Sequence, residues 1–229
     1  MFDSSGGPLT IAAPPAFSSK WLTPRLAGLR TVLPTIAIVN EDAGARHDRP
    51  PARAAVAIRY GPGAFGGLVA HRLLAETAIP VCHPDLLRSG PALTEPADML
   101  RHTLLHGRES LPGEGFPDWR QWFAWAGAPQ DTIQPGLTFD HHLTTVQAAL
   151  EAQGIALVKR SIVMTDLIRG NLVQLVQPEY PLAFAHFLVH GADTARGAEI
   201  ETLKRWLDQS LSQTVRDLPA AILPTAPDP

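Results

Sequence analysis

Arg59 and Tyr60 are the first residues in the chain whose type and place suggest ligand binding. They follow the small and apolar run 54–58 and enter the turn Gly61-Pro62-Gly63. An apolar run bounded by turn residues predicts a strand buried on both faces, as in a parallel sheet. A charge cannot pass through such a core, so we expect Arg59 at the carboxyl end of the strand, where open α/β sheets bind ligands. The alternative is a surface arginine beside an ordinary turn.

A pair of adjacent histidines, His141 and His142, is the second candidate for ligand binding. They stand near the start of the segment 140–154, in which Asp140 is a suitable N-cap and Gly154 a suitable left-handed C-cap. The free N–H groups and the positive end of a helix attract anions, and they should also discourage protonation of the two imidazoles. The alternative is two exposed histidines in the first helical turn.

Metal binding has weak support in the sequence. Asp98, His102 and His106 are four residues apart, so on a helix they would share one face and could hold a metal ion. The residues 103–105 between the histidines look extended, however, and on a strand this spacing fails. We therefore expect no metal site.

Catalysis has little support either. No serine lies in a G-x-S-x-G sequence, and Cys82 has no nearby residue that would activate it as a nucleophile. The glycines between 61 and 67 match neither a phosphate-binding loop nor a dinucleotide-binding fingerprint. We expect no catalytic residues and no cofactor, and hence a protein that is not an enzyme.

Composition narrows the class of protein further. The chain has 229 residues, of which 45% are hydrophobic and 18% charged, as in an ordinary globular protein. Its formal net charge is −3 and no run of lysine or arginine occurs, so it lacks the basic face that nucleic-acid binding requires. The single cysteine, Cys82, excludes an internal disulfide and suits a reducing compartment.

The N-terminal residues and the length of the apolar runs predict the cellular location of the protein. The first eight residues have neither a basic start nor an apolar centre, so they do not resemble a signal peptide. No apolar run approaches the length of about 18 residues that a membrane span needs. We therefore expect a cytoplasmic protein that has no contact with a membrane.

Strands and helices alternate through the first third of the chain. Leu22, Leu26, Leu29 and Leu33 form a helical stripe, which Pro24 interrupts and Pro34 ends. We expect strands at 9–13, 35–40 and 54–58, a helix at 17–33, and a long extended segment from 68 to 81. The order strand, helix, strand, connection, strand predicts a parallel α/β lobe.

The remainder of the chain predicts a second set of shorter elements. We expect helical turns at 84–87 and 96–100, a loop at 107–117, a short aromatic helix capped by Asp118, and a strand at 132–139. The helix at 140–154 follows, then strands at 155–158, 171–176 and 184–189, a helical piece at 161–169 and a last helix at 199–211. The proline-rich end of the chain predicts a flexible tail.

Six short motifs occur in an order that resembles a known family. They are Phe17 with Trp21-Leu22-Thr23-Pro24-Arg25-Leu26, Ala57-Ile58-Arg59-Tyr60-Gly61-Pro62-Gly63, Pro80-Val81-Cys82-His83-Pro84, His102-Thr103-Leu104-Leu105-His106, Phe139-Asp140 and Gly154-Ile155-Ala156-Leu157. Together they resemble the effector-binding domain of a LysR-type transcriptional regulator, in the branch of the glycine-cleavage activators and the β-lactamase regulators. The resemblance extends from about Leu9 to Leu207.

The resemblance implies an α/β fold of two Rossmann-like lobes joined by two crossover strands, as in a type 2 periplasmic binding protein. Lobe I would comprise residues 8–80 and 184–215, lobe II residues 81–183, and the flexible tail residues 216–229. A small polar or anionic effector would bind between the lobes and control transcription, and the domains would self-associate to a dimer or tetramer. The rival interpretation is a solute-binding protein of a transport system, which shares this fold.

The resemblance also implies where the effector binds. The expected residues lie at the start of the first helix, at the end of the central strand, at the crossover, at the helix start of the second lobe and on the returning strand: Ala16, Phe17, Ser18, Arg59, Tyr60, Cys82, His83, Asp140, His141, His142 and His186.

The sequence also departs from the family pattern. Relatives carry an N-terminal winged helix-turn-helix, which we expect to be absent from this chain, so that DNA would be bound only through that missing domain. Ala16 stands where many relatives have a hydroxyl, and His141 and His142 where they have serines. An acidic residue commonly precedes the Ala-Ile-Arg sequence, and here Ala55 replaces it. Because of these changes, the ligands of relatives cannot be transferred to this chain.

Overall fold

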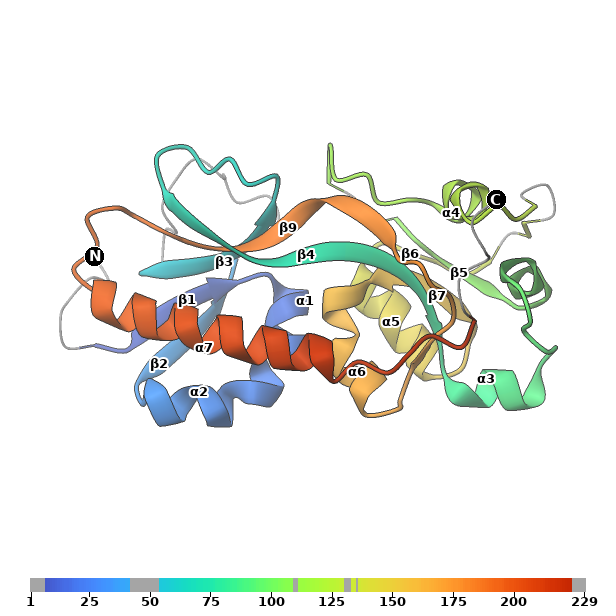
Figure 1. The fold of residues 1–229 in the computed structure, drawn as a ribbon, viewed down its shortest axis with the longest axis horizontal. Coiled ribbons are helices and arrows are strands. Elements are labelled where there is room, and N and C mark those ends of the chain that lie inside the picture. The colour runs from blue at the N-terminus through green and yellow to red at the C-terminus, as the bar shows by residue number, and fades with distance from the viewer. Residues whose placement is uncertain (1–6, 42–53, 109–110, 130–132, 135, 224–229) are drawn as a thin grey trace. The chain divides into compact units, whose positions relative to one another are not determined.

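The computed structural model describes residues 7–41, 54–108, 111–129, 133–134 and 136–223. The chain forms two compact units (Figure 1). Unit 1 contains the chain up to Glu76 and Ala183–Arg216, and unit 2 contains Thr77–Leu182 and the chain from Asp217. The first boundary falls within strand β4 (Val69–Cys82) and the second within β9 (Tyr180–His190), so two strands cross from one unit to the other.

Unit 1 is built on a mixed sheet. Its first three strands in the sequence are parallel to one another, as the alternation of strands and helices predicts. Strand β1 (Leu9–Ala13) pairs in parallel with β2 (Ile36–Asn40) on one side and with β3 (Val56–Gly61) on the other. Strand β9 then pairs antiparallel with β3, with Gly61 opposite Ala185, and β4 follows β9 in the sheet. Every residue of β3 is buried, Arg59 included. The expectation that a charge could not lie within this buried strand was therefore wrong.

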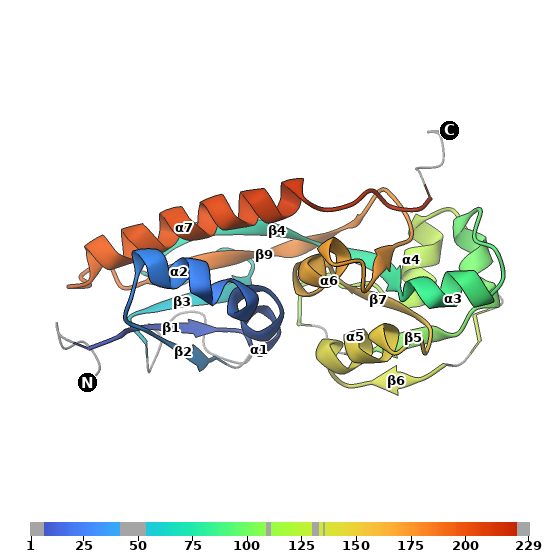
Figure 2. The same cartoon turned by 90° about the horizontal axis from the view of Figure 1, so that it is seen from below.

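The helices of unit 1 explain how the chain accommodates Pro24. The expected helix at 17–33 is a series of short pieces: α1 (Pro15–Phe17), a π-helical turn (Ser18–Leu22), a 3₁₀ turn (Thr23–Arg25) and α2 (Leu26–Val32). Pro24 lies in the first turn of the 3₁₀ piece, where a missing N–H costs little. The long helix α7 (Gly197–Arg216) lies beside α2 (Figure 2).

Helix α7 is amphipathic, as its sequence predicts. Its inward face buries Ile200, Leu203, Leu207 and Leu211 at the spacing of three or four residues that a helical stripe requires. Thr214, one turn further on, is also buried and accepts a hydrogen bond from the indole N–H of Trp21. The helix is longer than the predicted segment at 199–211 because this stripe continues beyond it.

Unit 2 is built on the part of the same mixed sheet that follows β4 in the strand order. Strand β7 (Ile155–Lys159) pairs antiparallel with the end of β4 and in parallel with β5 (Leu104–Gly107), and β6 (Thr138–Phe139) extends the parallel part beyond β5. The short strand β8 (Val173–Gln174) pairs antiparallel with the last residues of β4. Residues 132 and 135 of the expected strand 132–139 lie outside the described residues.

Unit 2 also contains several short helices. They are α3 (Pro84–Ser89), the 3₁₀ helix at Pro96–Arg101, α4 (Trp119–Trp125), α5 (His142–Leu150), a 3₁₀ turn at Arg160–Ile162 and α6 (Met164–Ile168). Asp118 caps α4 as predicted, because its carboxylate accepts the Gln121 N–H. The aromatic residues Trp119, Trp122 and Phe123 are buried in the core of the unit.

The predicted N-cap of α5 was wrong. The helix begins one residue later than expected, so the N-cap is His141, whose side chain makes no capping hydrogen bond, and Asp140 is an exposed residue before it. The predicted C-cap also lies elsewhere, since the left-handed residue is Ala152, with φ 55°. Gly154 is required for another reason: a Cβ there would lie 2.4 Å from the Thr103 carbonyl oxygen.

The segment after α7 packs onto unit 2. The Ile222 N–H donates to the Gln174 carbonyl, the Leu223 N–H to the Leu175 carbonyl, and Leu223 is buried in the core of the unit. The sequence predicts a flexible tail from residue 216, whereas residues 222 and 223 form a strand-like pairing beside β8. In the part of the chain that the structure describes, no helix is both long and apolar enough to cross a membrane.

Candidate functional site

Arg59 lies near the end of β3, and its side chain is held by an acidic residue. Its Nε and one terminal nitrogen donate to the two carboxylate oxygens of Glu41, at 3.0 and 2.7 Å. The side chain of Arg59 is 4% exposed and that of Glu41 14%. A bidentate arginine–carboxylate pair is strong and geometrically specific, and removing one partner of a buried pair typically costs about 3–5 kcal/mol. Arg59 therefore stabilises unit 1 through Glu41.

Glu41 supplies an acidic residue that the sequence reading missed. The family resemblance implies an acidic residue shortly before Arg59, where this chain has Ala55. Glu41 directly follows β2, and its N–H donates to the Ala13 carbonyl at the end of β1. Since β1 lies between β2 and β3, Glu41 reaches Arg59 from the far side of β1. The pairing depends on this strand order, which the sequence spacing alone does not reveal.

His186 is the centre of a buried cluster in unit 1. Its Nε2 lies 3.0 Å from a carboxylate oxygen of Glu76, and the two side chains are 5% and 0% exposed. The imidazole packs against the rings of Phe17 and Tyr60, at centroid distances of 4.8 and 5.0 Å. The structure thus brings together three residues predicted from separate parts of the sequence, and Glu76 orients the histidine among them.

The start of the first helix offers mostly backbone groups to the candidate site. Ala16 is half-buried, and Ser18 is 7% exposed. The Ser18 N–H donates to the Pro14 carbonyl, and the Ser18 carbonyl accepts the Thr23 hydroxyl. Phe17 is fully buried, so it forms part of the support for this segment and does not offer a polar group.

Cys82 and His83, predicted at the crossover, have structural roles in unit 2. Cys82 is fully buried among apolar side chains, and this burial raises the pKa of its thiol to about 12. His83 is the N-cap of α3, where its Nδ1 accepts the Asp85 N–H at 3.1 Å. Neither contact was predicted, although a residue directly before Pro84 at a helix start is a common capping position.

The two histidines near the start of α5 differ in exposure. Asp140 and His141 are exposed, whereas His142 is 2% exposed and its ring packs against Phe116 at a centroid distance of 4.6 Å. Phe116 comes from the expected loop 107–117. His141 is therefore the histidine of the pair that can meet a ligand, and His142 anchors the loop.

An ion pair that the sequence reading missed lies near His142. Lys159, the last residue of β7, lies 2.7 Å from a carboxylate oxygen of Glu114, and their side chains are 11% and 0% exposed. Lys159 could have been found by the argument used for Arg59, because it is a charge at the end of the apolar run 155–158. Glu114 could not, since it lies in a loop far from Lys159 in the sequence.

Asp98, His102 and His106 do not converge. Asp98 lies in a 3₁₀ helix and accepts hydrogen bonds from the hydroxyl and N–H of Thr94 and from the Glu95 N–H. These hydrogen bonds, the Thr94 ones first, lower the pKa of Asp98 to about 2. His102 hydrogen-bonds to the Pro91 carbonyl and His106 lies on β5. Among the described residues, no group of three or more potential ligands could hold a metal ion.

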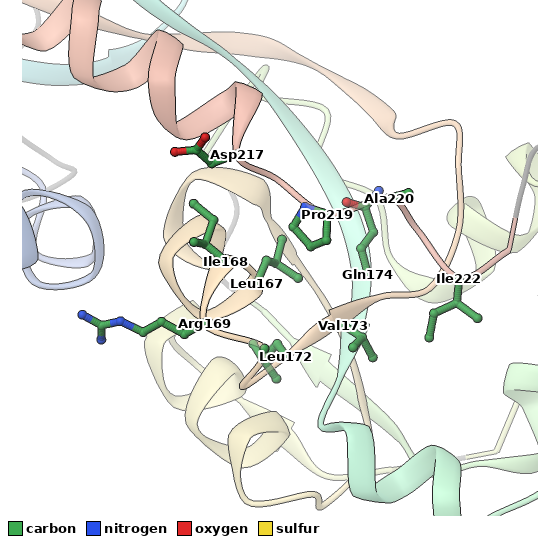
Figure 3. Close-up of a pocket in the computed structure, with 11 residues that line it drawn as sticks. Leu167, Ile168, Arg169, Leu172, Val173, Gln174, Asp217, Pro219, Ala220 and Ile222 are labelled. Carbon is green, nitrogen blue, oxygen red and sulfur yellow. The ribbon is translucent and has the colours of Figure 1, made fainter.

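A pocket of about 370 Å³ lies elsewhere in unit 2 (Figure 3). Its wall comes from the end of α6, from β8 and from the segment after α7, and it includes Leu167, Leu172, Val173, Pro219 and Ile222. Arg169 extends away from the tail residues in Figure 3. None of the residues predicted for effector binding lines this pocket, so we do not assign the effector to it.

Comparison with known proteins connects this geometry to a family. Residues 3–212 match the family model of the LysR substrate binding domain. The chain is 30% identical over 204 residues to the glycine cleavage system transcriptional activator of Escherichia coli K12. The matched region covers 89% of this chain and 65% of that relative. It is also 30% identical over 165 residues to the transcriptional activator AmpR of Pseudomonas aeruginosa, covering 72% of this chain and 53% of that protein.

Solved structures agree with this result. The effector domain of the transcriptional regulator AmpR of Pseudomonas aeruginosa superposes with a TM-score of 0.65 and 25% identity, over 91% of this chain and 97% of that one. The regulatory domain of CrgA from Neisseria meningitidis has the same fold, with a TM-score of 0.63 and 18% identity over 90% of this chain. The predicted α/β fold of the periplasmic-binding-protein type is therefore confirmed.

The resemblance inferred from the six motifs is confirmed as well, and the relatives that support it are transcriptional regulators, which favours a sensory role over solute transport. The chain spans about two thirds or less of the length of these curated relatives. This chain belongs to the LysR substrate binding domain family.

Proposed function

We propose that this chain is the ligand-sensing part of a LysR-type transcriptional regulator and binds one small polar or anionic effector with groups from both units. The observation that carries the proposal is the family match over residues 3–212. In unit 1 the proposed contacts are Ala16, Ser18, Tyr60 and the aromatic surroundings of His186. In unit 2 they are Asp140, His141 and the end of β7.

The structure changes the roles that we propose for several predicted residues. Arg59 is a positioning residue, because Glu41 holds two of its donors. Phe17 and His142 support the site from within the two units, since both are buried against other rings. Cys82 is a core residue and His83 a helix cap, so neither is a direct contact in the proposal.

The proposed mechanism is a shift between two states of the protein. An effector can change the population of two states only if its affinity for them differs. Contacts from both units would provide this difference, because they form together in only one of the states. No covalent step is involved, so we propose a binding protein without catalytic activity.

The partners and location are proposals about the whole protein. The match covers 65% of the E. coli relative, and we propose that DNA is bound by a winged helix-turn-helix that is not part of this sequence. Self-association to a dimer or tetramer and a cytoplasmic location belong to the same proposal. A formal net charge of −3 without a basic run supports the view that this part of the protein does not bind DNA by itself.

A thermal-shift screen of small acids, amino acids and sugars, followed by calorimetry, tests the proposal. We expect the compound that raises the melting temperature most to bind His141→Ala about tenfold more weakly than the unmodified chain, because one hydrogen bond to a charged group is worth about 1.5 kcal/mol or more. Gln147→Ala is the matched control, since Gln147 is exposed on the same helix. Equal affinity of the two variants would remove His141 from the site.

A further inference from the structure

Glu114 is a fully buried carboxylate between exposed residues of a loop. Its neighbours Pro112, Gly113 and Gly115 are exposed, whereas the Glu114 side chain is 0% exposed. Gly113 and Gly115 have positive φ values of 78° and 73°, which allow the chain to turn sharply on both sides of Glu114. The loop therefore directs one charged side chain inward.

The buried carboxylate has defined partners in unit 2. One oxygen lies 2.7 Å from Nζ of Lys159, and the other accepts the Leu111 N–H at 2.8 Å. The Glu114 N–H donates back to the Leu111 carbonyl. Phe116 closes the arrangement, since its ring packs against His142 and lies 5.9 Å from the Lys159 ammonium group. The carboxylate is held as a bound anion would be, by an ammonium group and a backbone N–H.

Lys159 lies at a strand end of the kind at which open α/β sheets bind ligands. Lys159 ends β7, which runs parallel to β5 and, beyond it, to β6, and α5 begins shortly after β6. Ligands of open α/β sheets bind outside the carboxyl ends of such strands. A lysine there presents a charge suited to a carboxylate, and Glu114 is the carboxylate that the structure places on it.

A purely structural role explains this pair poorly. Burying two charges costs several kcal/mol in desolvation, and apolar residues of similar size are often as good or better for stability. The sequence nonetheless directs a carboxylate from a glycine-flanked surface loop onto a lysine at the strand end. Part of what holds the carboxylate comes from the same loop, since Glu114 accepts the Leu111 N–H and donates its own N–H to the Leu111 carbonyl.

We propose that Lys159 is a carboxylate-binding position of the effector site and that Glu114 occupies it as a built-in carboxylate, which an anionic effector replaces. The inference rests on the proposed function and adds the chemical class of the ligand: a molecule with a carboxylate group. Glu114 then sets the threshold for binding, since an effector must compete with a carboxylate that is already in place.

Acetate is the probe that tests this assignment without knowledge of the effector. Thermal unfolding is measured in chloride and in acetate at constant ionic strength and pH 7, for the unmodified chain, Glu114→Gln, Lys159→Met and the double variant. Glu114→Gln keeps the size of the side chain and removes its charge. We expect acetate to stabilise Glu114→Gln more than the unmodified chain, by about an elevenfold shift in the folding equilibrium when acetate exceeds its dissociation constant tenfold.

The other variants separate this effect from the general influence of acetate on proteins. Acetate also stabilises by exclusion from protein surfaces, which acts on every variant alike. The additional stabilisation should therefore disappear in Lys159→Met and in the double variant. If Glu114→Gln gains no more from acetate than they do, the assignment is wrong and the pair is structural only.

A second substitution is used in case Glu114→Gln does not fold. If Glu114→Gln does not fold in chloride, folding restored by acetate but not by chloride supports the assignment. If it folds in neither, Glu114→Asp is used, which keeps the charge but withdraws it by one methylene group. The additional acetate effect should then appear in Glu114→Asp, and its absence overturns the assignment. The result is independent of the effector screen, so the proposed function and this assignment can fail separately.

Discussion

Charged and reactive side chains in this protein mostly have partners that the sequence does not show. Arg59 and Lys159 are each recognisable in the sequence as a charge that follows an apolar run. Both nevertheless lie within buried strands, where a carboxylate pairs with each of them. Their acids, Glu41 and Glu114, are not predictable in the same way. Each comes from a loop whose position depends on the order of the strands, and strand order is a property of the whole unit.

Cys82 illustrates how burial changes reactivity at the residue scale. The thiol pKa is raised to about 12 by desolvation, whereas an unfolded cysteine titrates near about 8.5. The native state therefore favours the protonated thiol. Its contribution to stability is complete below about pH 8.5 and is lost as the pH rises toward the folded-state value.

We expect Cys82 to react with a thiol reagent such as iodoacetamide only after the protein unfolds. The expected result at pH 8 is no modification of the native chain and one modified cysteine in denaturant, measured by mass spectrometry. The control is free cysteine at the same pH, which reacts readily. Stoichiometric modification of the native chain at the rate of free cysteine would show that the thiol is accessible.

At the scale of elements, most strands and helices follow from apolar periodicity. The strands at 9–13, 155–158 and 184–189 and the capped aromatic helix after Asp118 lie where the sequence predicts them. The predicted boundaries of α5 were less accurate. Asp140 and Gly154 are residue types that helix caps prefer, but neither is a cap of this helix. The chain instead turns at His141 and Ala152, and Gly154 is needed for its close approach to Thr103.

Helix α5 ends in a Schellman arrangement with an unusual residue. The Ala152 N–H donates to the Ala149 carbonyl and the Gln153 N–H to the Ala148 carbonyl. The left-handed position in this arrangement is Ala152, with φ 55°. Glycine is strongly preferred there because a Cβ atom makes the left-handed conformation cost about 1–2 kcal/mol.

We therefore expect Ala152→Gly to stabilise the protein by about 0.5–1 kcal/mol, since the strain that is relieved exceeds the added entropy of the unfolded chain. Denaturant unfolding measures the change. Ala148→Gly is the matched control in the same helix and should destabilise by about 1 kcal/mol. A loss of stability in Ala152→Gly similar to that of the control would show that the left-handed residue carries no strain.

For the whole molecule, the class of fold was predictable and the packing of its last segment was not. The alternation of strands and helices and the six ordered motifs led to the α/β fold and the family, both of which are confirmed. The proline-rich end predicted a flexible tail, yet Leu223 is buried in the core of unit 2. The few apolar residues among these prolines form too short a run to reveal such pairing with β8.

The proposed effector binds groups of both units. Hydrogen exchange measured by mass spectrometry, with and without the best compound from the thermal-shift screen, tests this most directly. We predict slower exchange in two separate peptides, one covering residues 14–24 of unit 1 and one covering residues 138–146 of unit 2. Protection in only one of them, or only in residues 167–174 and 217–222 around the pocket of Figure 3, would contradict the proposed effector site.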